Sequence, residues 1–271
     1  MLDLRLFRNP RFSAASGSVT VTFFSLAGFI FLITQYFQFI KGYGPFEAGV
    51  RTLPVATSVA IASVLGTKLA VRFGTKLIVT LGLWLLAVFF LWVSVSTVTT
   101  TYLTIAMAMV ICGTGMGLTS APATEAIMGV VPKEKAGVGS AVNDATRLLG
   151  ATLGVAVLGS VYASVYGTRL IATLPGGLPG AVTHAAHQSV GAAFTVAAHL
   201  RAGGHPALGG ALHHAAAHAF THGLSIGCLV AATVSAVGAL AAALLLPAQP
   251  PRAPQELAPL TRSPEPVAAL D

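Results

Sequence analysis

Long uncharged, apolar stretches alternate with short polar reversals along this chain. Residues 12–40 carry no Lys, Arg, Asp or Glu, and about 20 residues of helix suffice to cross about 30 Å of hydrocarbon. The first predicted membrane span is therefore 12–40. A cleaved signal peptide has a shorter apolar region of about 7 to 15 residues, so we expect an uncleaved helix.

Five more spans follow from the same pattern. The turn Gly42-Tyr43-Gly44-Pro45 precedes a span in which Pro54 is expected to kink the helix rather than break it. Residues 77–124 are uncharged and too long for one crossing, and the Ser/Thr cluster at 94–102 marks a turn within them. The predicted spans are 12–40, 47–70, 77–95, 103–128, 138–166 and 224–246.

This pattern divides the chain into four parts. Five transmembrane helices are expected in 1–166, and the sixth in 223–246. Between them, 167–222 is expected to form a His-rich external loop. The tail at 247–271 is rich in Pro and Ala, a composition typical of disorder, and it is expected to be cytoplasmic.

Composition supports an all-α polytopic protein of the cell membrane, in contact with lipid. Of the 271 residues, 55% are hydrophobic and 8% are charged, and the mean hydropathy is +0.80. A soluble domain carries about 25% charged residues, so a soluble enzyme is excluded. The formal charge of +7 would suggest nucleic acid as the partner of a soluble protein. In a membrane protein its placement matters more, and no nucleic-acid partner is expected.

The placement of the basic residues favours both termini on the cytoplasmic side, because cytoplasmic loops carry an excess of Lys and Arg. The predicted outer side holds Lys41, Arg51, Arg169 and Arg201. The predicted inner segments hold the other eleven of the 15 basic residues, which are Arg5, Arg8, Arg11, Lys68, Arg72, Lys76, Lys133, Lys135, Arg147, Arg252 and Arg262.

Glycines inside the spans predict close helix packing. The run from Gly113 to Gly117 has no preceding strand, so it does not fit a nucleotide-binding loop. Helices in lipid associate through faces of small residues. We therefore expect Gly113 and Gly117 in the fourth span, and Gly150 and Gly154 in the fifth, to lie at helix contacts.

An intramembrane carboxylate is costly, by about 2.5 to 3.5 kcal/mol near the centre of the membrane, and implies a partner or a task. Glu125 lies near the inner end of the fourth span, where Arg72, Lys76 and Arg147 are candidate partners. The alternatives are a static salt bridge or a side chain that snorkels to the interface, a latch that opens during transport, and a protonation site. Asp144 and Arg147 are three residues apart, a spacing that allows an ion pair on one helix face.

Three polar residues toward the outer end of the first span, Gln35, Tyr36 and Gln38, have two interpretations. They line a wet substrate pathway, or they sit in the headgroup region as interface anchors.

All eight histidines fall between Gly167 and Gly223, a segment without a single acid. A spacing of four residues places three of them on one helical face, which is compatible with a metal site. The expectation is instead a loop whose polar positions are His, with a pH response below about pH 6.5 as the alternative. No metal is expected at these residues: His184, His187, His199, His205, His213, His214, His218 and His222.

The chain carries no sequence motif of a hydrolase, a zinc enzyme or a nucleotide-binding protein. Cys112 and Cys228 both fall in apolar stretches and offer neither a disulfide framework nor metal-ligand spacing. We therefore expect neither enzymatic activity nor a cofactor.

Five blocks of the sequence have the character of family motifs. They are LRLFRNPRF at 4–12, GYGP at 42–45 with Ala48-Gly49 and Leu53-Pro54 after it, PATEAIMG at 122–129, AGVGSAVND at 136–144 and LGATLGVA at 149–156. Together they resemble the 14-span drug/proton antiporter branch of the major facilitator superfamily. The resemblance implies one six-helix half-bundle with a 3+3 inverted repeat, corresponding to the C-terminal half of such a transporter. It suggests a truncated or split gene product.

The segment LAVRFGTK at 69–76 resembles the loop motif that follows the second helix of a half in this superfamily. Val71 stands where that motif often has Asp, and Thr75 where it often has a basic residue. The resemblance implies a cytoplasmic gate of Arg72, Gly74 and Lys76 with Glu125 as the paired acid, and we add Asp144 and Arg147 to this group.

What the resemblance implies for function is proton-coupled efflux of small lipophilic or cationic substrates by alternating access. The partner would be an N-terminal half or a second copy of the chain, and the proton-coupling acid would lie in the N-terminal half. Two alternatives remain: a membrane-bound pH or metal sensor that uses the His-rich segment, and an inactive fragment. The sensor predicts loss of response when His214, His218 and His222 are replaced by Gln.

Overall fold

The computed structural model describes residues 7–132, 135–174 and 180–246. In these ranges six helical segments are long and apolar enough to cross a membrane, which confirms the predicted fold class. The tail expected at 247–271 lies outside the described residues. The elements are α1 (Pro10–Gln35), which continues as the π-helical η2 (Tyr36–Ile40), α2 (Pro45–Arg51), α3 (Leu53–Phe73), α4 (Thr75–Ser94), α5 (Tyr102–Met128), α6 (Ala136–Thr173), α7 (Gly180–Gln188), α8 (Val190–Ala202) and α9 (Pro206–Leu245).

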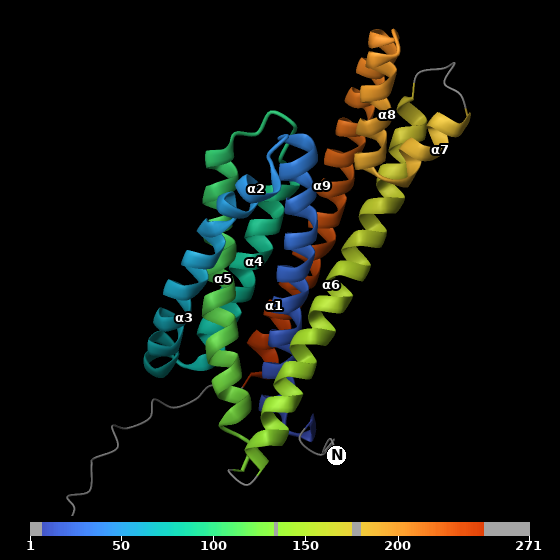
Figure 1. The fold of residues 1–271 in the computed structure, drawn as a ribbon. Coiled ribbons are helices and arrows are strands. Elements are labelled where there is room, and N and C mark those ends of the chain that lie inside the picture. The colour runs from blue at the N-terminus through green and yellow to red at the C-terminus, as the bar shows by residue number, and fades with distance from the viewer. Residues whose placement is uncertain (1–6, 133–134, 175–179, 247–271) are drawn as a thin grey trace, which may run out of the picture.

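The long helices run alternately up and down in a single bundle (Figure 1). The start of α1 and the end of α9 lie at one end, because Pro10 and Leu245 line the same groove. That end also holds the last turn of α3 and the first turn of α4, with Lys68, Arg72 and Lys76. We call it the basic end, and the opposite end, beside α2, the α2 end.

Local chemistry sets where the helices begin and end. The side chain of Asn9 accepts a hydrogen bond from the backbone N–H of Arg11 at 3.0 Å and caps α1, with Pro10 in the first turn. Gly74 joins α3 to α4 with φ = +90°, a conformation that favours glycine over any residue with a Cβ.

The second predicted span is interrupted rather than kinked. One helix ends at Arg51 and the next begins at Leu53, with Thr52 between them. Pro54 lacks a backbone N–H and fits the first turn of a helix, where that N–H has no partner anyway. The chain therefore starts a new helix at this proline, and α2 becomes a separate short element at the α2 end.

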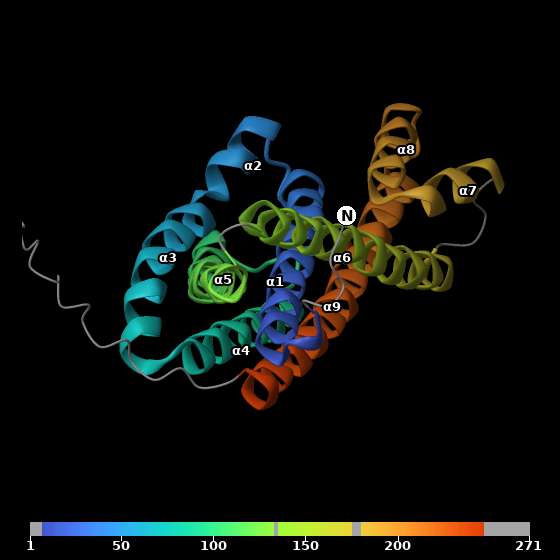
Figure 2. The same ribbon diagram turned by 90° about the horizontal axis from the view of Figure 1, so that it is seen from below.

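Helix neighbours follow the predicted 3+3 inverted repeat. The first three long helices correspond to the last three, and in each corresponding pair, α1 with α5, α3 with α6 and α4 with α9, the two helices run in opposite directions (Figure 1). Exchanging the two triplets preserves the main helix contacts. Thus α1 packs on α6 as α5 packs on α3, and α1 packs on α9 as α5 packs on α4. Viewed along the bundle in Figure 2, α1 lies centrally, between α5 and α4 on one side and α6 and α9 on the other.

Glycines lie at two equivalent helix contacts. Between α1 and α6, a Cβ added at Gly150 would meet the carbonyl oxygen of Thr20, and one added at Gly154 would meet that of Phe24. Between α3 and α5, a Cβ at Gly113 would lie 2.5 Å from the carbonyl oxygen of Val55. At Gly117 it would lie 2.6 Å from Cβ of Ala62. At all four positions the backbones approach too closely for a side chain.

The expected loop at 167–222 is helical in its described parts, and this corrects the prediction. The 38-residue α6 and the 40-residue α9 are each roughly 60 Å long at about 1.5 Å per residue, well beyond the membrane thickness. Their surplus length, with α7 and α8, forms what we call the helical extension (the described residues of 167–222). In Figure 1, α8 and the start of α9 rise above the other helices, and α7 lies beside the end of α6. Alanine and leucine, both good helix formers, fill much of this segment.

Aromatic contacts locate the base of the helical extension. The rings of Tyr36 and Phe220 lie 6.4 Å apart, and those of Tyr162 and Phe220 lie 5.3 Å apart. Tyr36 is at the end of α1 and donates from its hydroxyl to the carbonyl of Thr97 in the α4–α5 turn at 2.9 Å. Residues of α9 before Phe220 therefore stand beyond the membrane-spanning part of the bundle.

We predict that Gly154→Ala destabilises the bundle by about 1–3 kcal/mol, because the new methyl group must displace the α1 backbone. Gly17→Ala on α1 is the matched control, since its Cβ would meet nothing within 4 Å. Thermal unfolding in detergent, followed by size-exclusion chromatography, measures the difference. Equal midpoints for the two variants would contradict the role of Gly154 in close packing.

Candidate functional site

A cavity of about 550 Å³ lies among α1, α2, α3 and α5. Its walls are mainly apolar, with Phe29, Ile33 and Met116 among them, and its polar groups are Thr34, Gln38 and Thr52. The cavity is open to the outside, and Ile30 on its wall is half exposed. Apolar walls with a few polar groups are typical of a site for a small molecule.

Of the three residues predicted for a substrate pathway, only Gln38 lines this cavity. Tyr36 is 1% exposed and its hydroxyl is held by Thr97, so it is a core residue and the expectation for it is corrected. Gln35 donates from its amide nitrogen to the carbonyl of Phe31, one turn back, at 3.4 Å. A linear spacing does not reveal which of these side chains turns inward, since the helix changes to π geometry at Tyr36.

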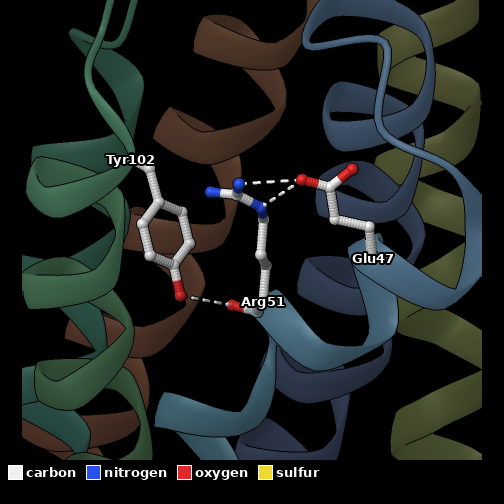
Figure 3. Close-up of polar contacts among 3 residues, drawn as sticks. All are labelled: Glu47, Arg51 and Tyr102. Atoms are coloured by element: carbon white, nitrogen blue, oxygen red, sulfur yellow. Dashed lines mark hydrogen bonds and ion pairs between the residues drawn. The ribbon is translucent and has the colours of Figure 1, made fainter.

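An arginine is held between two tyrosines beside the mouth of the cavity. The guanidinium carbon of Arg51 lies 4.0 Å from the ring centre of Tyr43 and 4.7 Å from that of Tyr102. Its Nε and Nη2 donate to Oε1 of Glu47 at 3.0 and 2.8 Å, and the Tyr102 hydroxyl donates to the Arg51 carbonyl at 3.1 Å (Figure 3). This arginine–tyrosine cluster fastens α2 to the start of α5.

Sequence reasoning missed this cluster. The spacing of four residues between Glu47 and Arg51 is itself a signal for a helical ion pair. No pattern indicates Tyr43 and Tyr102 as partners, because the three elements are brought together only by the fold. The cluster lies next to Ala48, Gly49 and Thr52, which line the cavity.

The predicted gate residues Arg72, Lys76 and Glu125 lie at the basic end of the described structure without pairing with one another. Gly113 packs on Val55 and Gly66 on Leu118, so α3 and α5 run parallel, and their last turns, which hold Arg72 and Glu125, both lie at the basic end. Both side chains are exposed, and within the described residues no ion pair joins Glu125 to Arg72, Lys76 or Arg147. Arg72 instead lies 5.4 Å from the ring centre of Phe73.

Asp144 and Arg147 do not form the expected helical ion pair in the described structure. Asp144 is exposed, whereas Arg147 is half-buried and turns toward α1 and α5. Its Nη2 donates to Oγ1 of Thr124 at 3.2 Å, and its guanidinium carbon lies 5.2 Å from the ring centre of Phe23. Its Nε is buried and has no hydrogen-bond partner among the described residues, so Arg147 retains donor capacity for another group.

Comparison with known proteins agrees with this architecture. The sequence profile described as Major Facilitator Superfamily matches residues 2–155. The chain belongs to this superfamily. It is a multi-pass membrane protein of a transporter family rather than a member of an enzyme family, and the match extends from α1 into α6.

Curated relatives in the superfamily are drug-resistance and efflux proteins. The multidrug resistance protein Stp of Mycobacterium tuberculosis is 33% identical over 59% of this chain and 30% of its own length. The multidrug efflux pump LfrA of Mycolicibacterium smegmatis is 33% identical over 74% of this chain and 40% of its own. The methylenomycin A resistance protein of Streptomyces coelicolor is 31% identical over 59% and 34%. The chain thus spans about 30 to 40% of the length of these relatives.

The helical extension, all of which lies beyond the superfamily profile match, carries the eight histidines. In the described residues no group of three His, Cys, Asp or Glu side chains is placed to hold a metal ion. His213 is half-buried on α9 and stacks on Phe194 of α8, with ring centres 4.2 Å apart. Burial, together with the nearby charges of Arg201 and His214, lowers the pKa of His213.

We predict that Arg51→Gln raises deuterium uptake in α2 at least twice as much as Glu47→Gln. Stacking on two rings contributes about 1–2 kcal/mol, whereas an exposed ion pair contributes about 0–1 kcal/mol. The Glu47 side chain is 48% exposed, which makes Glu47→Gln the control for loss of the ion pair alone. Equal uptake in the two variants would mean that the ion pair, not the stacking, holds α2.

Acidification should loosen α8 from α9. Because the folded-state pKa of His213 lies below its ordinary value of 6.5, its contribution to stability is complete above pH 6.5 and declines as pH falls below it. Deuterium uptake in α8, corrected for intrinsic exchange, should rise between pH 7 and 5. His213→Phe should abolish most of the rise, and His218→Gln, an exposed site on the same helix, should preserve it.

Proposed function

We propose that this chain is the C-terminal six-helix half of a proton-coupled, multidrug-type efflux transporter that works by alternating access with an N-terminal half. The observation that carries the proposal is the open cavity of about 550 Å³ on the α1, α2, α3 and α5 side. An open cavity on one side of a single bundle is what remains when half of a central binding site is present. The similarity to efflux proteins over 30 to 40% of their length supports this reading.

The walls of the cavity favour a small lipophilic or cationic substrate. They are predominantly apolar, and their few polar groups are uncharged. Carboxylates are lacking among the described lining residues, so the acid that couples transport to protons is proposed to come from the N-terminal half. The arginine–tyrosine cluster at the mouth fixes α2 at the rim of this half-site.

The basic end is proposed to form the cytoplasmic gate, with both termini on the cytoplasmic side. Arg72, Gly74 and Lys76 provide the cations and the turn, and Glu125 lies at the same end of the bundle, in the last turn of α5. Since Glu125 is unpaired with these cations in the described structure, we propose that their ion pair belongs to another state of the transport cycle. Asp144 and Arg147 are available for contacts with the partner half.

The first test is drug susceptibility and dye efflux in efflux-deficient cells that express this chain alone or with an N-terminal half of a homologous transporter, at matched membrane levels. Efflux is expected only with the N-terminal half, and Glu125→Gln should reduce it. Efflux from the chain alone would replace the split transporter by a homodimer. No efflux in either arm, despite insertion, would contradict the proposal.

A cavity-filling variant links transport to the described site. Gly49 lines the cavity, and a Cβ there would meet nothing within 4 Å. Gly49→Leu should therefore fold and lower efflux of a bulky dye by at least about tenfold, the effect of a methylene-scale steric change in a pocket. Gly210→Leu, also unobstructed but on the helical extension, is the matched control. Unchanged efflux in Gly49→Leu would exclude the cavity from the transport path.

A further inference from the structure

A second cavity, of about 510 Å³, lies at the basic end, far from the proposed substrate site. It is formed by the start of α4, the end of α3 and Ala243 near the end of α9. Its lining along α4 is Lys76, Leu77, Thr80, Leu81 and Trp84. We call it the basic-end groove. Gly74 and Lys76 of the proposed gate are among its lining residues, but the proposed function assigns no ligand to the groove.

The lining residues on α4 are arranged in order of polarity. Lys76, Thr80 and Trp84 are spaced by four residues, so they follow one another along one helix face. The cationic amine comes first, the hydroxyl one turn deeper, and the indole one turn deeper again. Leu77 and Leu81, which are 57% and 49% exposed, supply the apolar side of this row.

Positive charge converges on the polar mouth of the groove. Gly74 at the N-cap has no side chain to cap α4, and the first turn of this helix holds no acidic residue. The helix dipole therefore adds to the charge of Lys76, and Arg72 lies in the last turn of α3 beside it. An anion is the complementary group at this mouth.

The Thr80 hydroxyl, one turn deeper than Lys76, has unused hydrogen-bonding capacity. Oγ1 of Thr80 is buried and has no hydrogen-bond partner among the described residues. Buried polar atoms are normally paired. Threonine in a helix populates two χ1 rotamers, so a rotation of Thr80 would bring this hydroxyl to an occupant that offers an acceptor one helical turn below its anionic group. The remaining depth of the groove is apolar down to Trp84.

We infer that the basic-end groove binds an anionic phospholipid of the membrane. Its phosphate would lie at Lys76 and the start of α4, its ester carbonyl at Thr80, and its acyl chain along Leu81 and Trp84 against Ala243. The order of anion, acceptor and hydrocarbon along a phospholipid matches the order of cation, hydroxyl and apolar wall along α4. Charge selects the headgroup, because juxtamembrane cations attract anionic lipids.

The test uses the native fluorophore of the groove. The chain contains two tryptophans, so Trp92→Phe leaves Trp84 as the only one. This full-length variant is reconstituted in vesicles that contain a bromine-labelled phosphatidylglycerol or a bromine-labelled phosphatidylcholine at equal mole fraction. Quenching of Trp84 should indicate an association about fivefold tighter for phosphatidylglycerol, equivalent to one cationic contact.

Two matched pairs of variants distinguish lipid binding in the groove from lipid binding elsewhere on the protein surface. Lys76→Gln should abolish the preference for phosphatidylglycerol, while Lys68→Gln, an exposed cation of the same segment outside the groove, should keep it. Ala243→Phe should weaken quenching by both lipids, while Ala236→Phe, half-buried elsewhere on α9, should not. Equal quenching by the two lipids in the Trp92→Phe protein would overturn the inference. An equal loss of the preference for phosphatidylglycerol in Lys76→Gln and Lys68→Gln would also overturn it.

Discussion

Close approach of helix backbones at glycine is the constraint on which this structure depends. Helices surrounded by lipid gain little from hydrophobic burial against one another and rely on packing. Gly150 and Gly154 bring α6 onto the α1 backbone, and Gly113 and Gly117 bring α5 onto α3. These two seams are equivalent in the inverted repeat, and each fixes the position of one helix against its neighbour, α6 against α1 and α5 against α3. The open cavity lies among helices placed by these seams.

The sequence predicted the membrane helices well, because a long apolar stretch without charges is a strong signal of a membrane span. The predicted ends of the helices were less accurate. Pro54 was expected to kink a span, but a proline also fits the first turn of a new helix, and only the surrounding structure decides between the two outcomes. At 167–222, histidine and glycine obscured a helical pattern. In α9, Leu212, Ala216 and Phe220 are buried and His214 and His218 are exposed, which is the alternation of an amphipathic helix.

The candidate site was less predictable than the fold, because its residues meet across elements. Gln38 was identified as a polar residue in an apolar span, but the same argument also selected Tyr36, which is buried in the core. The stacking of Arg51 between Tyr43 and Tyr102 joins a turn, a short helix and the start of α5, and periodicity contains no information on such contacts. Charged residues are obvious in the sequence, but the sequence does not show which groups they contact. Arg147 bonds to Thr124 on α5 rather than to Asp144 on its own helix.

The unusual length of α6 and α9 has a mechanical consequence. Both helices pass without interruption from the membrane-spanning bundle into the helical extension, where Tyr166 donates to the carbonyl of Ala186 at 3.1 Å and ties α7 to α6. A continuous helix transmits rotation along its axis as a stiff rod. Any tilt of this bundle is therefore magnified with distance, and the tip of the extension travels farther than any residue inside the membrane. The displacement of the extension outside the lipid therefore depends directly on the tilt of α6 and α9 within the lipid.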